Sequence, residues 1–216
     1  MTEACTPDDI VAAAHTLSAL GLVAAFGHVS ARTADHLMIT PAGDLAKVTA
    51  ADLIALPLDA DSLPPGTPGE AWIHLAIYRH RPQVAAVVRA IPESALAATA
   101  VTTSIAPIHG QGCWLGDTLP IHDDARLMRT LDIAEAVTTT LAAGDAVAVR
   151  GNGAVTTGAY PGEAVARMWL LERTCRMHLA ASAAGKPTPL NPAEVAAWRA
   201  VAAPMLQRLW THLKHQ

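Results

Sequence analysis

The sequence predicts a layered α/β/α sandwich, in which helices cover a central β-sheet of mostly antiparallel or mixed strands. Three observations lead to this prediction: a length of 216 residues, a 51% share of hydrophobic residues, and an irregular alternation of helix-like and strand-like segments. A chain of this length buries about 70% of its unfolded surface, which is enough for a core without disulfides or a structural metal. We therefore expect one domain spanning residues 1–216.

The first part of the chain is expected to form one helix followed by strands. Residues 6–9 read TPDD, which is typical of a helix start with proline in the first turn and acidic groups at the positive end of the dipole. This helix is expected to end between Gly21 and Gly27. Strands are expected at 29–32, 37–40 and 52–58, before a loop at 64–69 that is rich in proline and glycine.

The remainder of the chain alternates between the two kinds of element. Apolar periodicity and turn residues between the segments define them. The expected helices are 70–81, 92–101, 124–142, 161–183 and a final amphipathic helix at 192–213. The expected strands are 84–88, 105–109, 145–149 and 154–158.

Charge and cysteine content narrow the class of function. A net charge of −4 and an isoelectric point near 6.2 provide no basic surface for nucleic acid or an acidic membrane. The uncharged stretches 10–31 and 94–116 are interrupted by polar residues, so neither is expected to span a membrane. Three cysteines, Cys5, Cys113 and Cys175, lack paired spacing and favour a cytoplasmic protein. The remaining classes of function are chemistry on a small molecule and binding to another protein.

Five phrases occur along the chain in a characteristic order. They are GLVAAFGHVSAR, MITPAG, GEAWIHLAIYRHRPQVAAVV, AVRGNGAVTTG and GEAVARMWLLERTCRMHLAA. Over residues 8–185 they resemble the class II aldolase/adducin family, which includes L-fuculose-phosphate aldolase, ribulose-phosphate 4-epimerase, decarboxylases of hydroxylated acids and the non-catalytic adducin head. The resemblance implies the same fold and a homo-oligomer, commonly a tetramer with its active site between subunits.

The chain has ten histidines, a number that suggests a metal site, but none of them stands where the family has its metal ligands. The family's enzymes bind a divalent metal, usually zinc, through a His-x-His pair and a later histidine, and this metal stabilises an enolate. At the corresponding positions this chain has Arg89, Ile91 and Asn152. A guanidinium, a hydrocarbon and an amide are not a zinc ligand set. We therefore predict no metal ligand residues and no cofactor.

The resemblance also indicates which residues carry the chemistry. Glu70 matches the family glutamate that serves as acid/base or as an extra ligand. Arg89 is predicted to replace the metal cation by binding a carboxylate or enolate through two parallel hydrogen bonds. Asn152 is expected to donate a further hydrogen bond, and His28 to move a proton. Two alternatives remain open: an Arg89–Glu70 ion pair that fills a dead metal site, and a relocated metal.

The substrate-binding residues are predicted in part from the same phrases and in part from the segment 105–116. Positions that carry hydroxyl groups in phosphosugar enzymes hold Ala25, Ala42, Pro68 and Gly69 here, which argues against a phosphorylated substrate. The GHVSAR form looks more similar to the decarboxylase branch. The residues expected to contact substrate are Gly27, Ser30, Gly43, His109 and Trp114, and His109 or Trp114 is a candidate for donation from a neighbouring subunit.

These inferences combine into one functional prediction. The chain is expected to be a lyase or related isomerase that acts without the family metal on a non-phosphorylated, anionic, oxygenated small molecule. The alternative is a non-catalytic ligand-binding or scaffolding member of the family, as in adducin.

Overall fold

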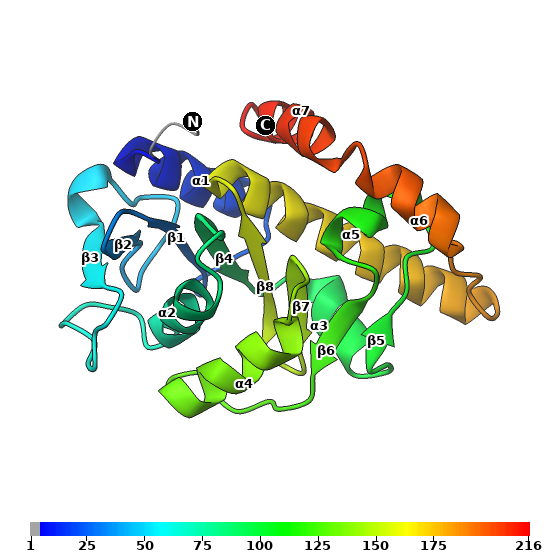
Figure 1. Ribbon diagram of the computed structural model, residues 1–216, viewed down its shortest axis with the longest axis horizontal. Helices are drawn as coiled ribbons and strands as arrows, with labels where there is room; N and C mark the ends of the chain where they lie inside the picture. The colour runs from blue at the N-terminus through cyan, green and yellow to red at the C-terminus, as the bar shows by residue number, and fades with distance from the viewer. Residues whose placement is uncertain (1–4) are drawn as a thin grey trace.

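The computed structural model describes residues 5–216, in which helices cover both faces of one central sheet (Figure 1). The strands are β1 (His28–Arg32), β2 (His36–Ile39), β3 (Ile54–Pro57), β4 (Ala86–Ala90), β5 (Ser104–Ile105), β6 (Leu119–His122), β7 (Ala146–Val149) and β8 (Gly153–Gly158). The α-helices are α1 (Pro7–Ala19), α2 (Ala71–His80), α3 (Glu93–Thr99), α4 (Leu131–Leu141), α5 (Pro161–Ala184), α6 (Pro192–Arg199) and α7 (Ala202–Leu213). Two 3-10 helices, η1 (Ala50–Asp52) and η2 (Gly110–Leu115), complete the chain.

The sheet has the strand order β3-β2-β1-β4-β8-β7-β6-β5. Its neighbouring strands are antiparallel except for β6 and β7, which are parallel. The predicted α/β sandwich with a mostly antiparallel sheet is confirmed. Within residues 5–216, no helix combines the length and the apolar character that a membrane span requires.

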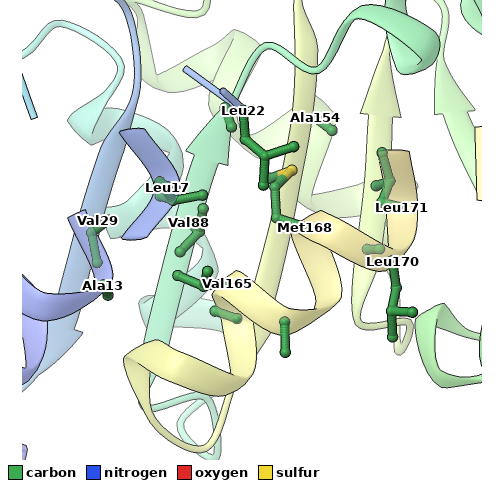
Figure 2. Packing of buried hydrophobic residues seen from close by; sticks show 14 of the residues in the cluster. Ala13, Leu17, Leu22, Val29, Val88, Ala154, Val165, Met168, Leu170 and Leu171 are labelled. Atoms are coloured by element: carbon green, nitrogen blue, oxygen red, sulfur yellow. The ribbon is translucent and has the colours of Figure 1, made fainter. Parts of the chain in front are cut away.

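Two hydrophobic clusters lie on opposite faces of the sheet. We call the side covered by α1, α5 and α7 the α5 face, and the side covered by α2 and α4 the α2 face (Figure 1). Side chains alternate between the faces of a strand. In β4, therefore, Val88 packs in the cluster of the α5 face, where Figure 2 shows it near Val165 and Met168 of α5, while Val87 packs in the cluster of the α2 face.

The same alternation distributes the side chains of β1. Val29 and Ala31 belong to the cluster of the α5 face. His28 and Ser30 therefore project toward the α2 face, and both are buried. In the pairing of β1 with β4, His28 lies opposite Arg89. Polar residues of two neighbouring strands thus meet under α2.

Several predicted boundaries were wrong for local reasons. The strand expected at 84–88 is β4, which begins two residues later because residues 81–84 form a turn closed by the Val84 N–H and the Arg81 carbonyl. The strand expected at 52–58 is shorter, because Asp52 ends η1 with its carboxylate bonded to Thr49. The strand expected at 105–109 ends after Ile105, and β6 was not predicted. Pro107, which lacks an N–H, disfavours continued pairing there.

Two predicted helices were also wrong in extent. The helix expected at 124–142 begins only at Leu131, because the Asp124 carboxylate accepts from the Arg126 N–H and stabilises a turn instead. The final helix expected at 192–213 is divided into α6 and α7. Pro204 explains the division, since it cannot donate to the Ala200 carbonyl and its ring would collide with that group in a continuous helix.

Candidate functional site

Four predicted residues meet at one end of the sheet. His28 begins β1, Arg89 lies beside it in β4, Glu70 caps the N-terminus of α2, and Asn152 occupies the turn between β7 and β8. All four are at most 7% exposed. We call this group, together with Arg129, the polar cluster. The structure therefore brings the whole predicted catalytic set together.

His28 and Glu70 face each other with 3.8 Å between Nε2 and Oε2, which is longer than a hydrogen bond. The facing His28 side chain is the largest influence that lowers the pKa of Glu70, to about 2, and the charge of Arg89 acts in the same direction against burial. Burial lowers the pKa of His28 below 6.5, although Glu70 acts to raise it. At neutral pH the pair is therefore a carboxylate beside a neutral imidazole.

Arg89 and Asn152 form the second pair of the polar cluster. The Arg89 Nη2 donates to the Asn152 side-chain oxygen at 2.7 Å and to its backbone carbonyl at 3.2 Å. The Asn152 amide in turn donates to the Arg126 carbonyl at 3.0 Å. Burial lowers the pKa of Arg89, while the charge of Glu70 raises it, and a guanidinium remains charged at neutral pH. This pair fixes a permanent cation beside His28.

Some polar atoms of the polar cluster have no hydrogen-bond partner among the described residues. They include Arg89 Nε and His28 Nδ1, both of which are buried. A buried polar atom without a partner is costly unless something else satisfies it. The polar cluster therefore has hydrogen-bonding capacity left for an added polar group.

Arg129 is a residue of this site that the sequence analysis missed. Its Nε lies 3.3 Å from Glu70 Oε1, and its side chain is 55% exposed. A Cβ at Gly69 would lie 2.8 Å from Arg129 Cγ, so the glycine makes room for the arginine stem. The expected helix at 124–142 would have included Arg129. The turn-forming Asp124–Arg126 pair is the sequence signal that could have indicated a loop here.

The charges of the polar cluster do not cancel. Arg89 and Arg129 are cationic, Glu70 is anionic and His28 is neutral at pH 7. One positive charge therefore remains in a mostly buried site. Electrostatics of this sign favours an anionic ligand, and guanidinium groups bind carboxylates in a directed way.

The residues that we predict at the family's metal positions do not fit a divalent metal as a ligand set. Arg89 and Asn152 are bonded to each other, and Ile91 follows directly after β4. A guanidinium has no lone pair to offer a metal, and a hydrocarbon has none either. Across residues 5–216 no group of three or more histidine, cysteine, aspartate or glutamate side chains is arranged to hold a metal ion.

Ser30, predicted to bind substrate, is fully enclosed in the structure. Its Oγ lies 2.7 Å from His74 Nδ1 and 2.8 Å from the Tyr78 hydroxyl, and none of its surface is exposed.

The two glycines predicted to contact substrate have different surroundings. A Cβ at Gly27 would lie 2.3 Å from Val23 Cγ1, whereas Gly43 faces open space. Gly27 thus permits close packing of the loop that precedes His28.

His109 and Trp114, also predicted to bind substrate, contact the helices beyond the sheet. His109 Nε2 lies 2.9 Å from Thr174 Oγ1 on α5. The Trp114 indole N–H donates to the Trp198 carbonyl on α6, and Trp114 is 4% exposed. These contacts anchor η2 to α5 and α6, and a role in a neighbouring subunit's site stays a prediction.

Together, the fold and the polar cluster define an α/β protein with a buried ionic site at the end of an antiparallel sheet. The chain belongs to the class II aldolase/adducin family, because residues 8–179 match the Class II Aldolase and Adducin N-terminal domain. The resemblance noted from the sequence is thereby confirmed.

Individual relatives agree with this assignment. The chain is 31% identical over 202 residues to the 3,4-dihydroxyphthalate decarboxylase of Terrabacter sp. (strain DBF63), with 84% of this chain and 83% of that protein covered. Its structure is similar to L-fuculose-1-phosphate aldolase from Thermus thermophilus, with 27% identity, a TM-score of 0.73, and 80% and 92% of the two chains covered. It also shares the fold of YgbL from Escherichia coli, with 23% identity, a TM-score of 0.77, and 89% and 97% covered.

Proposed function

We propose that this chain is a lyase that breaks a carbon–carbon bond in a non-phosphorylated, oxygen-rich anion, and that decarboxylation of a hydroxylated acid is its reaction. The observation that carries the proposal is the buried Arg89 guanidinium, fixed by Asn152 next to His28 and near the Glu70 carboxylate. A relative named 3,4-dihydroxyphthalate decarboxylase supports the choice of reaction and of a carboxylate substrate.

The substrate class follows from charge and from missing hydroxyl groups. The polar cluster has one excess positive charge, which favours a carboxylate. The positions that would supply hydroxyl groups to a phosphate hold Ala25, Ala42 and Gly69, and Gly69 instead packs against the Arg129 stem. Both features favour a carboxylate over a phosphate ester.

In the proposed reaction, the residues of this chain hold charge and move one proton. Arg89 and Arg129 bind the carboxylate and the neighbouring oxygen of the substrate. Neutral His28 takes the proton of the substrate hydroxyl and delivers it to the carbon that carries the carboxylate. The bond between that carbon and the carboxylate breaks, carbon dioxide leaves, and the electron pair returns to the oxygen. The resulting oxyanion takes a proton from solvent, which balances the reaction.

The proposal does not include the family metal. Arg89 occupies a metal-ligand position and would repel a divalent cation, while it can stabilise the same developing oxyanion itself. Glu70 then serves as the ionised partner that favours a protonated His28 during the reaction. No step is assigned to a metal or to another cofactor.

A non-catalytic role is the second candidate. Arg89 is bonded to Asn152 and Glu70 contacts Arg129, so the polar cluster is partly closed upon itself. An ion network of this kind can persist after chemistry is lost, because removal of one partner leaves a buried charge. The chain would then bind an anion without converting it, in a ligand-binding or scaffolding role.

Carbon dioxide release provides the test. Purified protein is incubated with 3,4-dihydroxyphthalate and related hydroxylated aromatic acids, before and after chelator treatment, and its metal content is measured. We expect release from the wild type that survives chelation and is lost in Glu70→Gln, Arg89→Ala and Asn152→Ala. Arg150→Ala is the matched control, because Arg150 pairs with Asp123 on the surface and is expected to have no role.

Two outcomes would contradict the proposal. Thermal stabilisation by these acids without any product would favour the non-catalytic role. Activity that requires stoichiometric zinc, manganese or iron would contradict the metal-free mechanism.

A further inference from the structure

A line of buried polar side chains crosses the interface between β1 and α2. His28 and Ser30 are two residues apart in β1 and therefore share a face of the strand. Glu70, His74 and Tyr78 follow one another at intervals of four and share a face of the helix. The two series meet side by side, and His28 and Glu70 form one end of the line.

The other members of this line hydrogen-bond to one another. Ser30 Oγ lies 2.7 Å from His74 Nδ1 and 2.8 Å from the Tyr78 hydroxyl. Ser30, His74 and Tyr78, which we call the core triad, are each at most 1% exposed. Polar groups buried to this extent are costly unless they are paired.

One assignment of donors and acceptors satisfies both hydrogen bonds of the core triad. Burial holds the pKa of His74 well below 6.5, so its imidazole is neutral and Nδ1 can accept. Ser30 then donates to His74 and accepts from the Tyr78 hydroxyl. The charges of His28, Arg89 and Glu70 influence the pKa of His74, so the core triad lies near the polar cluster.

These bonds restrain α2 in a way that its apolar contacts cannot. Hydrophobic burial is non-directional, whereas a hydrogen bond weakens steeply with distance and angle. A shift of α2 by one residue in register moves it about 1.5 Å along its axis and turns it by about 100°, which would carry His74 and Tyr78 away from Ser30. The core triad therefore fixes the position of the helix along β1.

The position of α2 determines the position of Glu70. Glu70 is the N-cap of the helix, one turn before His74, and its carbonyl accepts from the Ile73 N–H. His28 lies two residues before Ser30 in β1. The distance between the Glu70 carboxylate and the His28 ring thus depends on the register that the core triad sets.

We propose that Ser30, His74 and Tyr78 are positioning residues, which set the register of α2 on β1 and thereby hold Glu70 opposite His28. The proposal rests on the proposed function in one respect, namely that Glu70 and His28 act on the substrate. The core triad itself is enclosed and contacts no substrate.

The test replaces the whole core triad by apolar residues of similar shape, in the variant Ser30→Ala/His74→Leu/Tyr78→Phe. Because no partner is left unpaired, the variant is expected to remain folded with a Tm close to that of the wild type. The readout is the His28 ring pKa by NMR, with and without Glu70→Gln. Glu70 raises this pKa, so Glu70→Gln lowers it in the wild type. In the triple variant we expect that response to be lost.

Kinetics provide a second readout. If the wild type turns over a substrate, the triple variant is expected to lose about a hundredfold in kcat, a loss that a displacement near 1 Å can cause, with little change in KM. Ile73→Val is the matched control, since it trims a buried apolar side chain of the same helix. It should keep both the NMR response and kcat.

The outcomes separate this proposal from the proposed function. A full response to Glu70→Gln in the triple variant would overturn the positioning role, even in an active enzyme. A lost response would uphold it even if no substrate is turned over, because NMR needs no substrate. Should the triple variant not fold, Ser30→Ala decides the question by the same two readouts, since it removes both hydrogen bonds.

Discussion

The two faces of the sheet are built from alternate residues of the same strands, yet they differ in character. On the α5 face the strand residues are small and apolar, and the 24-residue helix α5 packs against them. They are Val29, Ala31, Ala86, Val88 and Ala90. On the α2 face, the intervening positions of the two strands include His28, Ser30 and Arg89. Neighbouring residues of one strand therefore serve different purposes: one packs in the hydrophobic cluster of the α5 face, and the next lies among the polar side chains of the α2 face. Stability and function should respond to different substitutions.

The largest expected effect lies on the α2 face. Arg89→Met keeps a long apolar stem and removes the guanidinium that is proposed to stabilise the developing oxyanion. We expect kcat/KM to fall about a thousandfold, as when one preorganised donor is removed from an active site. Steady-state kinetics measure this effect, and circular dichroism checks that the variant is folded. Activity near the wild-type value would contradict the conclusion that function depends on the polar residues of the α2 face.

The counterpart on the α5 face is Leu170→Ala. Leu170 of α5 is fully buried in the hydrophobic cluster of the α5 face (Figure 2). Truncation should cost about 3 kcal/mol of the free energy of unfolding, from lost burial and the cavity that remains. Urea denaturation measures this loss. The activity per folded molecule should be unchanged, and a matching loss of activity would show that the two faces are coupled.

Acid sensitivity distinguishes the faces in a different way. The pKa of Glu70 is lowered from 4.5 to about 2, so its stabilising contribution is complete above pH 4.5 and is lost as the pH falls toward 2. We expect Glu70→Gln to flatten the decline of Tm over this range. Leu170→Ala should lower Tm at every pH without changing the slope. An identical acid slope in wild type and Glu70→Gln would contradict the assigned pKa.

The smallest expected effect is at the start of α1, on the α5 face. Thr6 caps the helix by accepting from the Asp9 N–H, and Asp9 bonds back to Thr6. Thr6→Ala should cost about 1 kcal/mol of the free energy of unfolding. Chemical denaturation can resolve this change, and kinetics should show none. Reduced turnover would indicate that α1 influences the site.

Much of the fold could be predicted because local signals decided it. The cap at Thr6, the turn at Gly151 to Gly153, and the apolar run before Arg89 each specify an element without reference to distant residues. The errors occurred where a local contact competed with periodicity. Asp124 formed a turn within an expected helix, and Pro204 divided another.

The candidate site was predicted less completely than the fold. Motif order identified His28, Glu70, Arg89 and Asn152, and the structure brings them together. Arg129 joined them only because a long irregular loop lays it against Gly69. Ser30 had the correct position in the strand but a different environment, since its hydroxyl bonds to His74 within the core.

The sequence by itself determined the family and most of the elements, and it is the basis of the prediction that Arg89, Ile91 and Asn152 replace the family's metal ligands, because these inferences depend on order and spacing along the chain. Only the tertiary structure decided which side chains meet. The pairing of β1 with β4 places His28 beside Arg89, and the docking of α2 brings Glu70 to both. Contacts between segments far apart in sequence depend on sheet register and helix position, which no single stretch of the chain encodes.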